Sequence, residues 1–170
     1  GRPLPGMETR IAEGELQLRA TSSPTFFSHY LDGERFEGEW WQTGDLVRED
    51  GDGYLFFEGR GDDIILSSGY RIGPTEVESA LLSHPAVADA AAVAAPDPER
   101  GSVVRAIVVL RDGEPGDSPS GDALARELQE HCKRETAPYK FPRIVEFAAE
   151  LPKTSSGKIK RAQLRGQAAM

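Results

Sequence analysis

The chain has 170 residues, 38% of them hydrophobic and 28% charged, with a net charge of −8 and a single cysteine, Cys132. These values are ordinary for a globular protein of one domain or two small ones, and no run of 18 apolar residues or leader-like segment predicts a membrane span or secretory signal. One cysteine excludes an intrachain disulfide framework and favours a reducing compartment, the cytoplasm, while three dispersed histidines offer no metal-ligand spacing.

The first third of the chain is predicted to be mostly β-structure. Residues 15–19 alternate polar and apolar side chains, which is typical of a half-buried strand. Residues 20–38 contain Pro, Gly, Ser and aromatic residues and are predicted to form a long packed loop. Two further strands, 40–47 and 54–57, flank the turn sequence at 50–53 (DGDG), which is a strong hairpin signal.

From residue 64 onward, short strands and helices are predicted to alternate. Ile64-Ile65-Leu66 is predicted as a short buried strand that a turn at 67–69 follows. The remaining predictions are helices over 74–84, 122–135 (capped by Asp122) and around 160–165, strands over 87–95, 103–110 and 143–147, and a flexible loop over 112–121. This alternation predicts a small α+β module of about 100 residues.

Residues 59–78 (GRGDDIILSSGYRIGPTEVE) concentrate groups that suit an anionic ligand. Arg60 and Arg71 flank the short strand, and guanidinium forks bind phosphate oxygens in pairs. Gly69 has no Cβ, so a ligand can approach the backbone there. For this stretch alone, a hairpin with surface arginines is an equally good interpretation.

Charge is distributed unevenly along the chain. Residues 1–130 hold 11 basic and 25 acidic residues, a net charge of −14, whereas residues 131–170 hold 9 basic and 3 acidic residues, a net charge of +6. A basic end on an acidic body predicts an anionic partner, either nucleic acid or a phosphorylated small molecule. Because no recognisable nucleic-acid-binding signature accompanies the charge, we favour the small molecule.

Two further motifs carry chemistry. WWQTGD at residues 40–45 ends in Asp45, whose two carboxylate oxygens can accept hydrogen bonds from the two hydroxyls of a ribose. LPKTSSGKI at residues 151–159 places a lysine on a glycine-bearing loop. The second motif mimics a Walker phosphate loop but has Pro152 where that loop needs Gly, and Ile159 where it needs Ser or Thr.

Several other notable side chains are predicted to have structural or solvent-facing roles. His131 and Cys132 are expected to pack a helix against the sheet. Lys153, Lys160 and Arg161 are expected to be solvated charges.

Together, and in this order, these stretches resemble the adenylate-forming (AMP-binding) superfamily, which comprises acyl-CoA synthetases, adenylation domains of non-ribosomal peptide synthetases and luciferases. The segments GYRIGPTEVES, HPAV, PDPERG, APYKFPR and LPKTSSGKIKR are most similar to medium-chain and aryl acyl-CoA synthetases. The resemblance covers nearly the whole chain, but only the C-terminal portion of such an enzyme. It implies that residues 1–60 form the β-rich end of a large N-terminal domain, and residues 61–170 a small mobile C-terminal domain with a short sheet flanked by helices.

The resemblance also implies a role for each matching residue. Asp45 would bind the AMP ribose, Arg60 the ribose and phosphate, and Arg71 the AMP phosphate. Lys158 would be catalytic and would bridge the acyl carboxylate and the α-phosphate of ATP during adenylation. Asp62 would be the hinge of the small domain. For Asp63, a structural pairing with a neighbouring arginine is expected, which leaves the hinge to Asp62 alone. Residues implied to contact CoA are Ser68, Gly69 and Tyr70 along the pantetheine, and Arg100, Lys133, Phe141, Pro142 and Arg143 at the nucleotide end.

The implied reaction converts a carboxylic acid, ATP and CoA into acyl-CoA, AMP and pyrophosphate through an acyl-adenylate. Mg²⁺ is expected with ATP, although this chain shows no ligand set for it. The missing N-terminal domain would be the partner that carries the ATP phosphate loop and acyl pocket, so the chain alone is expected not to adenylate. Two alternatives stay open: an adenylation domain that loads a carrier protein, and a non-catalytic nucleotide- or nucleic-acid-binding module that uses the basic tail.

Overall fold

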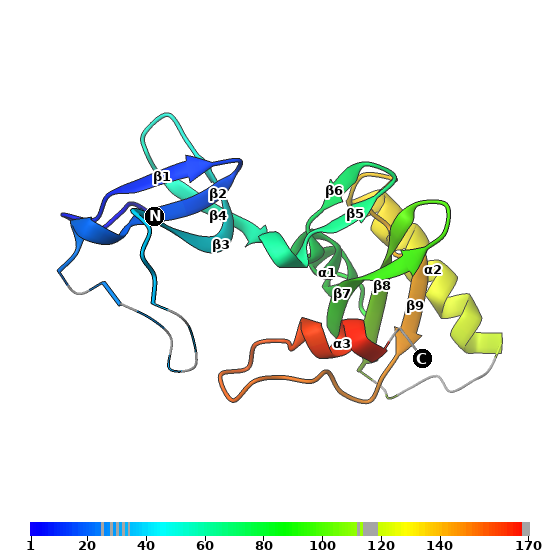
Figure 1. Ribbon diagram of the computed structural model, residues 1–170. Coiled ribbons are helices and arrows are strands. Elements are labelled where there is room, and N and C mark those ends of the chain that lie inside the picture. Colours follow the sequence, from blue (N-terminus) through cyan, green and yellow to red (C-terminus); the bar gives the residue numbers. More distant parts are fainter. Residues whose placement is uncertain are drawn as a thin grey trace. The chain divides into compact units, whose positions relative to one another are not determined.

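The computed structural model describes residues 1–24, 26, 27, 29, 31, 33, 35–111, 113 and 119–167. The chain divides into two compact units, Gly1–Asp62 and Asp63–Met170. Each unit has its own sheet (Figure 1). None of the described helices combines the length and the apolar character needed to cross a bilayer.

The first unit is a four-stranded antiparallel sheet in the order β1-β2-β3-β4. Its strands are β1 (Thr9–Ala12), β2 (Glu15–Arg19), β3 (Trp40–Glu49) and β4 (Leu55–Arg60), and a 3₁₀ turn follows β2 at Ala20–Ser22. The β2, β3 and β4 predictions are confirmed. The strand β1 was not predicted, because it is only four residues long and its turn, Glu13-Gly14, lacks the Asn-Gly or Asp-Gly signature.

Aromatic side chains cover one part of this sheet. The Trp41 ring lies edge-on to the rings of Phe27 and Phe36, with centroid separations of 4.7 and 5.4 Å. Phe26 stacks on Phe27 at 4.8 Å. The described part of the predicted loop 20–38 therefore does pack against β3.

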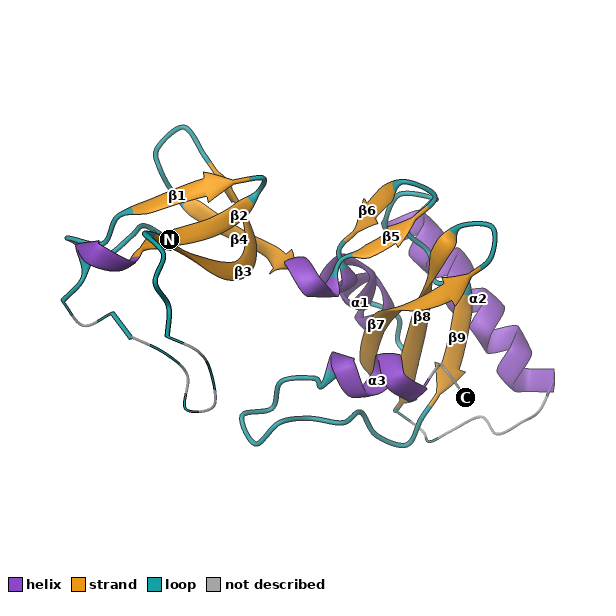
Figure 2. Ribbon diagram, in the orientation of Figure 1, coloured by secondary structure: helices purple, strands orange, loops and turns teal. Residues whose placement is uncertain are grey.

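The second unit is built on a sheet in the order β6-β5-β8-β7, with β9 parallel to β8. Figure 2 shows this sheet together with its helices. The elements are β5 (Ile65–Ser67), β6 (Tyr70–Ile72), α1 (Pro74–Leu82), β7 (Val87–Asp97), β8 (Gly101–Leu110), α2 (Pro119–Glu135), β9 (Ile144–Phe147) and α3 (Arg161–Gln167). This is the predicted α+β arrangement.

Alternation along β7 assigns the helices to two faces of the sheet. Ala90 and Ala92 belong to the cluster that contains Leu81 of α1 and Leu128 of α2. The intervening residues Ala91 and Val93 belong to a second cluster, which also includes Leu151 of the following loop and Leu164 of α3. Because successive strand side chains point to opposite faces, α1 and α2 pack on one face and α3 on the other.

Several predicted boundaries were wrong. The helix predicted over 74–84 ends at Leu82. The second helix begins at Pro119, so Asp122 lies inside its first turn and does not cap it. The stretch predicted as one strand and a turn is the hairpin β5–β6, which confirms the hairpin alternative for its geometry. Most of the predicted loop 112–121 lies outside the described residues.

Cys132 has the packing role that the sequence predicts. Its side chain is 1% exposed and belongs to the core between α2 and the sheet. Burial raises the pKa of the thiol to about 11, because desolvation disfavours the thiolate. The neighbouring His131 bonds the end of α1, with its Nε2 2.7 Å from Ser83 Oγ and 3.1 Å from the Ala80 carbonyl oxygen. Both residues therefore hold α2 in place.

Candidate functional site

In the first unit, Asp45, Arg60 and Asp62 form one ion cluster. Asp45 and Arg60 are paired positions on β3 and β4, which places their side chains side by side. Arg60 donates through Nη1 to Asp45 Oδ1 at 3.0 Å and to the Thr43 carbonyl at 2.7 Å, and through Nε to Asp62 Oδ1 at 3.2 Å. The hydrogen bond to Asp45 raises the pKa of the Arg60 guanidinium above its ordinary value. The structure thus joins three residues for which the sequence predicts nucleotide and hinge roles.

Gly44 makes room for this cluster. Its φ of +74° is in the left-handed region, and a Cβ at this position would lie 2.6 Å from Arg60 Nη2. The Gly44 N–H also donates to Glu15 Oε1 at 2.7 Å, which fixes this part of β3 to β2. Any side chain at Gly44 would displace the guanidinium from Asp45.

In the second unit, the turn between β5 and β6 is a two-residue hairpin turn. Ser68 and Gly69 have φ values of +48° and +83°, the type I′ pattern. Ser68 donates its N–H to the Arg100 carbonyl at 3.1 Å, and Arg100 Nη1 donates to Ser68 Oγ at 3.1 Å. Apart from Gly69 and its chain neighbours, no heavy atom of the described residues lies within 4 Å of the Gly69 Cβ position. The Ser68-Gly69 turn is therefore held by its hydrogen bonds with Arg100. It is open at Gly69, where the resemblance implies that the pantetheine arm of CoA passes.

Two rings connect this turn to the segment after α2. Tyr70 stacks on Tyr139, with a centroid separation of 4.3 Å and an interplanar angle of 19°. Lys140 Nζ reaches the Glu76 carboxylate of α1 at 2.6 Å, which holds that segment against the helix. The sequence reasoning missed Tyr139 and Lys140, although both lie within the quoted segment APYKFPR.

Lys133, Phe141 and Arg143 form a compact group. Lys133 Nζ lies 4.3 Å and Arg143 Cζ 5.0 Å from the centroid of the Phe141 ring. Cations attract the face of an aromatic ring, so one ring holds two positive charges. Pro142 is fully buried, so its side chain offers no surface to a ligand. The group presents two cations of the kind that phosphates attract.

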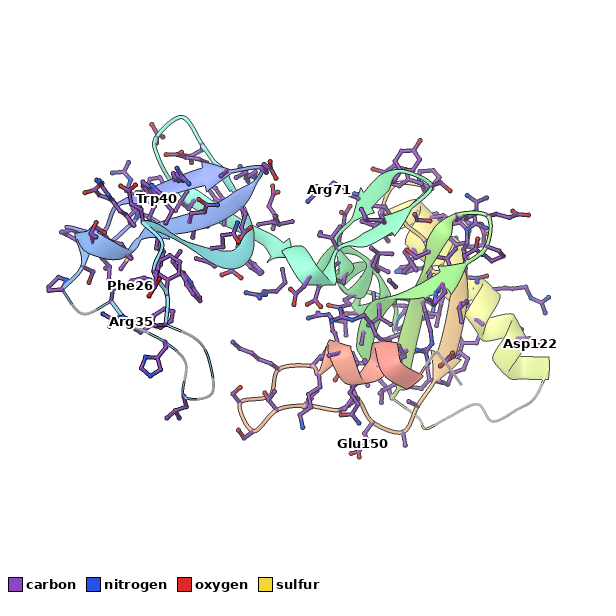
Figure 3. All side chains as sticks on the ribbon, in the orientation of Figure 1. Phe26, Arg35, Trp40, Arg71, Asp122 and Glu150 are labelled. Atoms are coloured by element: carbon purple, nitrogen blue, oxygen red, sulfur yellow. The ribbon has the colours of Figure 1, made fainter. Side chains whose placement is uncertain are left out.

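Arg71 lies apart from the cations around Phe141. It is on β6, paired with Leu66 of β5, and its side chain extends away from the sheet (Figure 3). Among the described residues it has no hydrogen-bond or ion-pair partner. Its guanidinium is therefore available to an anion, and its phosphate-binding role stays a prediction.

Lys158 stands on a tightly closed loop. The loop is pinned by a bridge between Lys153 and Ile159, and the Thr154 N–H donates to the Lys158 carbonyl at 2.8 Å. Gly157, with a φ of +83°, makes the reversal. Ile159 packs into the core while Lys158 is exposed, and the Lys158 ammonium has no partner among the described residues. The loop therefore presents one unneutralised positive charge.

The neighbouring charges differ from the prediction. Arg161 was expected to be solvated, yet its side chain is 21% exposed and Nη2 lies 2.7 Å from Glu78 Oε2. Lys153 is also paired, with Asp89 at 2.6 Å. The predicted pairing of Asp63 with an arginine is confirmed, because Arg165 donates to it at 2.7 Å. These pairs anchor the loop and α3 to the sheet and to α1.

We call the turn at Ser68-Gly69 the glycine turn, and the loop over residues 153–159 the lysine loop. They lie at opposite ends of the second unit (Figure 1). The glycine turn is bonded to Arg100, just beyond the end of β7, whereas the lysine loop is bonded to Asp89 at the start of β7. At about 3.3 Å per residue, roughly 25 Å of strand separates these two anchor points. The two predicted functional surfaces are thus far apart on one rigid body.

The described residues contain no group of three or more His, Cys, Asp or Glu side chains that could hold a metal ion.

Comparison with known proteins identifies the family. Residues 76–158 match the family model of the AMP-binding enzyme C-terminal domain. This region of the chain belongs to the AMP-binding enzyme C-terminal domain family. The match includes Arg100, Lys133 and Lys158, so the resemblance inferred from the motifs is confirmed for this region.

Curated and solved relatives extend the match over nearly the whole chain. It is 52% identical over 168 residues to human acyl-coenzyme A synthetase ACSM5, mitochondrial, covering 96% of this chain and 28% of that protein. Among solved structures, the anthranilate CoA ligase AuaEII in complex with anthranoyl-AMP has 38% identity and a TM-score of 0.78, covering 99% of this chain and 34% of that one. The o-succinylbenzoate CoA synthetase MenE from Bacillus subtilis, in complex with the acyl-adenylate OSB-AMP, has 34% identity and a TM-score of 0.79, covering 97% and 35%. The chain thus spans about a third or less of the length of these relatives.

Proposed function

We propose that the whole protein is an AMP-forming acyl-CoA synthetase, of which this chain is the C-terminal part. It would convert a carboxylic acid, ATP and CoA into acyl-CoA, AMP and pyrophosphate through an acyl-adenylate. The observation that carries the proposal is the placement of an unneutralised lysine and an open glycine turn at opposite ends of the second unit. Such a body can offer two different surfaces to one reaction centre.

In the first half-reaction, a carboxylate attacks the α-phosphate of ATP. Two anions must approach each other, and a cation that contacts both stabilises the transition state. The Lys158 ammonium suits this role because it is exposed, lacks an acidic partner among the described residues, and stands on a loop fixed at both sides. Asp45 would meanwhile bind the AMP ribose, and Arg60 and Arg71 the ribose and phosphate.

In the second half-reaction, the CoA thiol attacks the acyl-adenylate carbonyl. The turn at Ser68 and Gly69 would line the pantetheine arm, since no atom lies over Gly69. Arg100 and the cations around Phe141 would attract the phosphates of the CoA nucleotide. Each such charge-assisted contact contributes roughly 1.5–3 kcal/mol, enough for a few cations to dominate CoA docking.

Rotation at Asp62 would exchange the two surfaces. Asp62 lies in the short 3₁₀ turn Gly61–Asp63, where the division between the two units falls. Because the lysine loop and the glycine turn are about one strand length apart, a large rotation of the second unit would withdraw one and deliver the other. Mg²⁺ would arrive with ATP and be held by groups outside this chain.

CoA is preferred over a carrier protein or nucleic acid as the partner of the basic tail. Much of the tail's charge is already neutralised by acids of the chain, in the pairs Lys133–Glu130, Lys140–Glu76, Lys153–Asp89, Arg161–Glu78 and Arg165–Asp63. Among the described residues, these pairs leave fewer open cations for a polynucleotide. Arg143, beside the Phe141 ring, has no acidic partner in the described part of the chain and suits the phosphates of free CoA, which a carrier-bound pantetheine lacks at that position. We place the enzyme in the cytoplasm, which fractionation of cells that express it would test.

The function is tested by assaying the full-length enzyme and this chain side by side. The full-length enzyme should show acid-dependent ATP–pyrophosphate exchange, and form acyl-CoA when free CoA is added. The chain of 170 residues should show no exchange, because residues 1–58 contain no Gly-rich phosphate loop. Exchange by the chain alone, or a requirement of the full-length enzyme for a carrier domain, would contradict the proposal.

Replacing Gly44 with alanine should weaken nucleotide binding by the full-length enzyme. Both Gly44 and Gly53 have a positive φ, +74° and +78°, so alanine at either position should cost about 1–2 kcal/mol of stability. Only at Gly44 does the new Cβ meet Arg60, whereas at Gly53 the nearest atom is Glu49 Oε1 at 3.6 Å. We expect the KM for ATP to rise about threefold to tenfold for Gly44→Ala only. Equal KM values in the two variants would show that the Asp45–Arg60 arrangement does not serve ATP.

A further inference from the structure

Four charged side chains join the start of the second unit to its last helix. Arg161, the first residue of α3, bonds the Glu78 carboxylate through Nε at 3.2 Å and Nη2 at 2.7 Å, and its Nη1 lies 3.4 Å from Asp63 Oδ2. Arg165 donates to Asp63 Oδ1 at 2.7 Å. We refer to Asp63, Glu78, Arg161 and Arg165 as the α3 ion cluster.

The α3 ion cluster is balanced in charge, and its two carboxylates are largely shielded from water. The side chains of Glu78 and Asp63 are 9% and 12% exposed. Glu78 Oε1 also accepts the Ala92 N–H of β7 at 2.9 Å, so the cluster is bonded to the central sheet as well. Two carboxylates face two guanidiniums, and removing one partner leaves a shielded charge unpaired. The contacts should therefore persist while the enzyme turns over.

The α3 ion cluster joins a residue next to the proposed hinge to a residue next to the lysine loop. Asp63 directly follows the proposed hinge residue Asp62, and Arg161 comes three residues after Lys158. Between them, the Lys160 N–H donates to the Pro152 carbonyl at 2.9 Å, which closes the base of the lysine loop. The α3 ion cluster thus connects the end of the hinge to the base of the loop through two side-chain contacts.

We propose that Arg161 is a positioning residue for Lys158, because it holds the base of the lysine loop against Glu78 of α1 and next to Asp63, the residue that follows the hinge. This inference rests on the function proposed above. When the second unit rotates at Asp62, the lysine loop then moves together with it, and the Lys158 ammonium reaches a defined position. The glycine turn does not depend on this link, since its own anchor is Arg100 in the turn between β7 and β8.

The proposal predicts a separation of the two half-reactions. Arg161→Ala in the full-length enzyme should lower kcat for acyl-adenylate formation about tenfold or more, because a misplacement near 1 Å can cost as much as 100-fold. The KM for ATP, and thioester formation from supplied acyl-adenylate and CoA, should change less than about twofold. Arg161→Lys, which keeps the charge but not the two-pronged contact with Glu78, should be intermediate. Lys160→Ala is the matched control, since Lys160 is exposed and has no side-chain partner among the described residues.

The outcomes separate this inference from simpler explanations. A general structural defect would lower both half-reactions equally, and that result, or unchanged adenylation, would overturn the positioning role. Should Arg161→Ala fail to fold, Asp63→Asn tests the same link from its other side, because it weakens the contacts of both Arg161 and Arg165 with residue 63. It should also lower adenylation more than thioester formation, and unchanged adenylation would count against the link. Absence of acyl-adenylate formation by the wild-type enzyme would instead refute the proposed function.

Discussion

Replacing Lys158 with alanine in the full-length enzyme is expected to lower acyl-adenylate formation about 100- to 1,000-fold. Loss of one well-placed electrostatic group that acts on developing charge has effects of this size. The same variant should form thioester normally from supplied acyl-adenylate and CoA, because the lysine loop and the glycine turn lie at opposite ends of the second unit. ATP–pyrophosphate exchange and single-turnover thioester formation would measure the two steps separately.

Lys160 again provides the control for Lys158. Both side chains are exposed and both belong to the same basic segment, but Lys160 lies at the closed base of the loop. Lys160→Ala should therefore retain adenylation within about twofold, as is usual for surface substitutions away from a site. If Lys158→Ala and Lys160→Ala lose activity alike, general electrostatic attraction of ATP by the tail explains the result better than a placed catalytic group. If Lys158→Ala loses both half-reactions alike, the lysine does not act in adenylation alone.

The sequence predicted the elements of this fold where periodicity and burial agree. Residues 103–110 are all apolar except Arg105, and they form most of the central strand β8. The edge strands β1 and β6 have four and three residues, too few to show a period. The strand β1 was missed, and β6 was covered only by the hairpin alternative. Their pairing depends on type I′ turns at Glu13-Gly14 and Ser68-Gly69, which non-glycine residues seldom form.

The sequence names residues for the candidate site, whose roles stay predictions, but not the contacts among them. Motif matching selected Asp45, Arg60 and Lys158, and the structure shows why each is placed as it is. Motif matching could not show that Ser68 and Arg100 share two hydrogen bonds, because 32 residues separate them. Arg161 was judged to be solvated from its basic surroundings, since Glu78 lies 83 residues away in the sequence. Pairings between distant segments are set by the topology of the sheet, which local patterns do not contain.

Replacing Gly69 with leucine is expected to have the opposite effect from Lys158→Ala. The Cβ position of Gly69 is open, so the side chain would project into the space that we assign to the pantetheine arm. Thioester formation from supplied acyl-adenylate should fall on the order of 100-fold, because the thiol would no longer reach its attack position. Adenylation, measured by ATP–pyrophosphate exchange, should stay within about twofold of the wild-type rate.

Gly14 offers a close match as a control for Gly69. Both glycines are the second residue of a type I′ turn, with φ values of +85° and +83°, and no atom lies within 4 Å of either Cβ position. Leucine should therefore lower the stability by about 1–2 kcal/mol through backbone strain, and by a similar amount at the two positions. Only Gly69 has a proposed ligand above it, so Gly14→Leu should leave both half-reactions unchanged. Equal thioester activity in the two variants would mean that CoA does not pass over the β5–β6 turn, and the second surface of the proposed mechanism would have to be sought elsewhere on the unit.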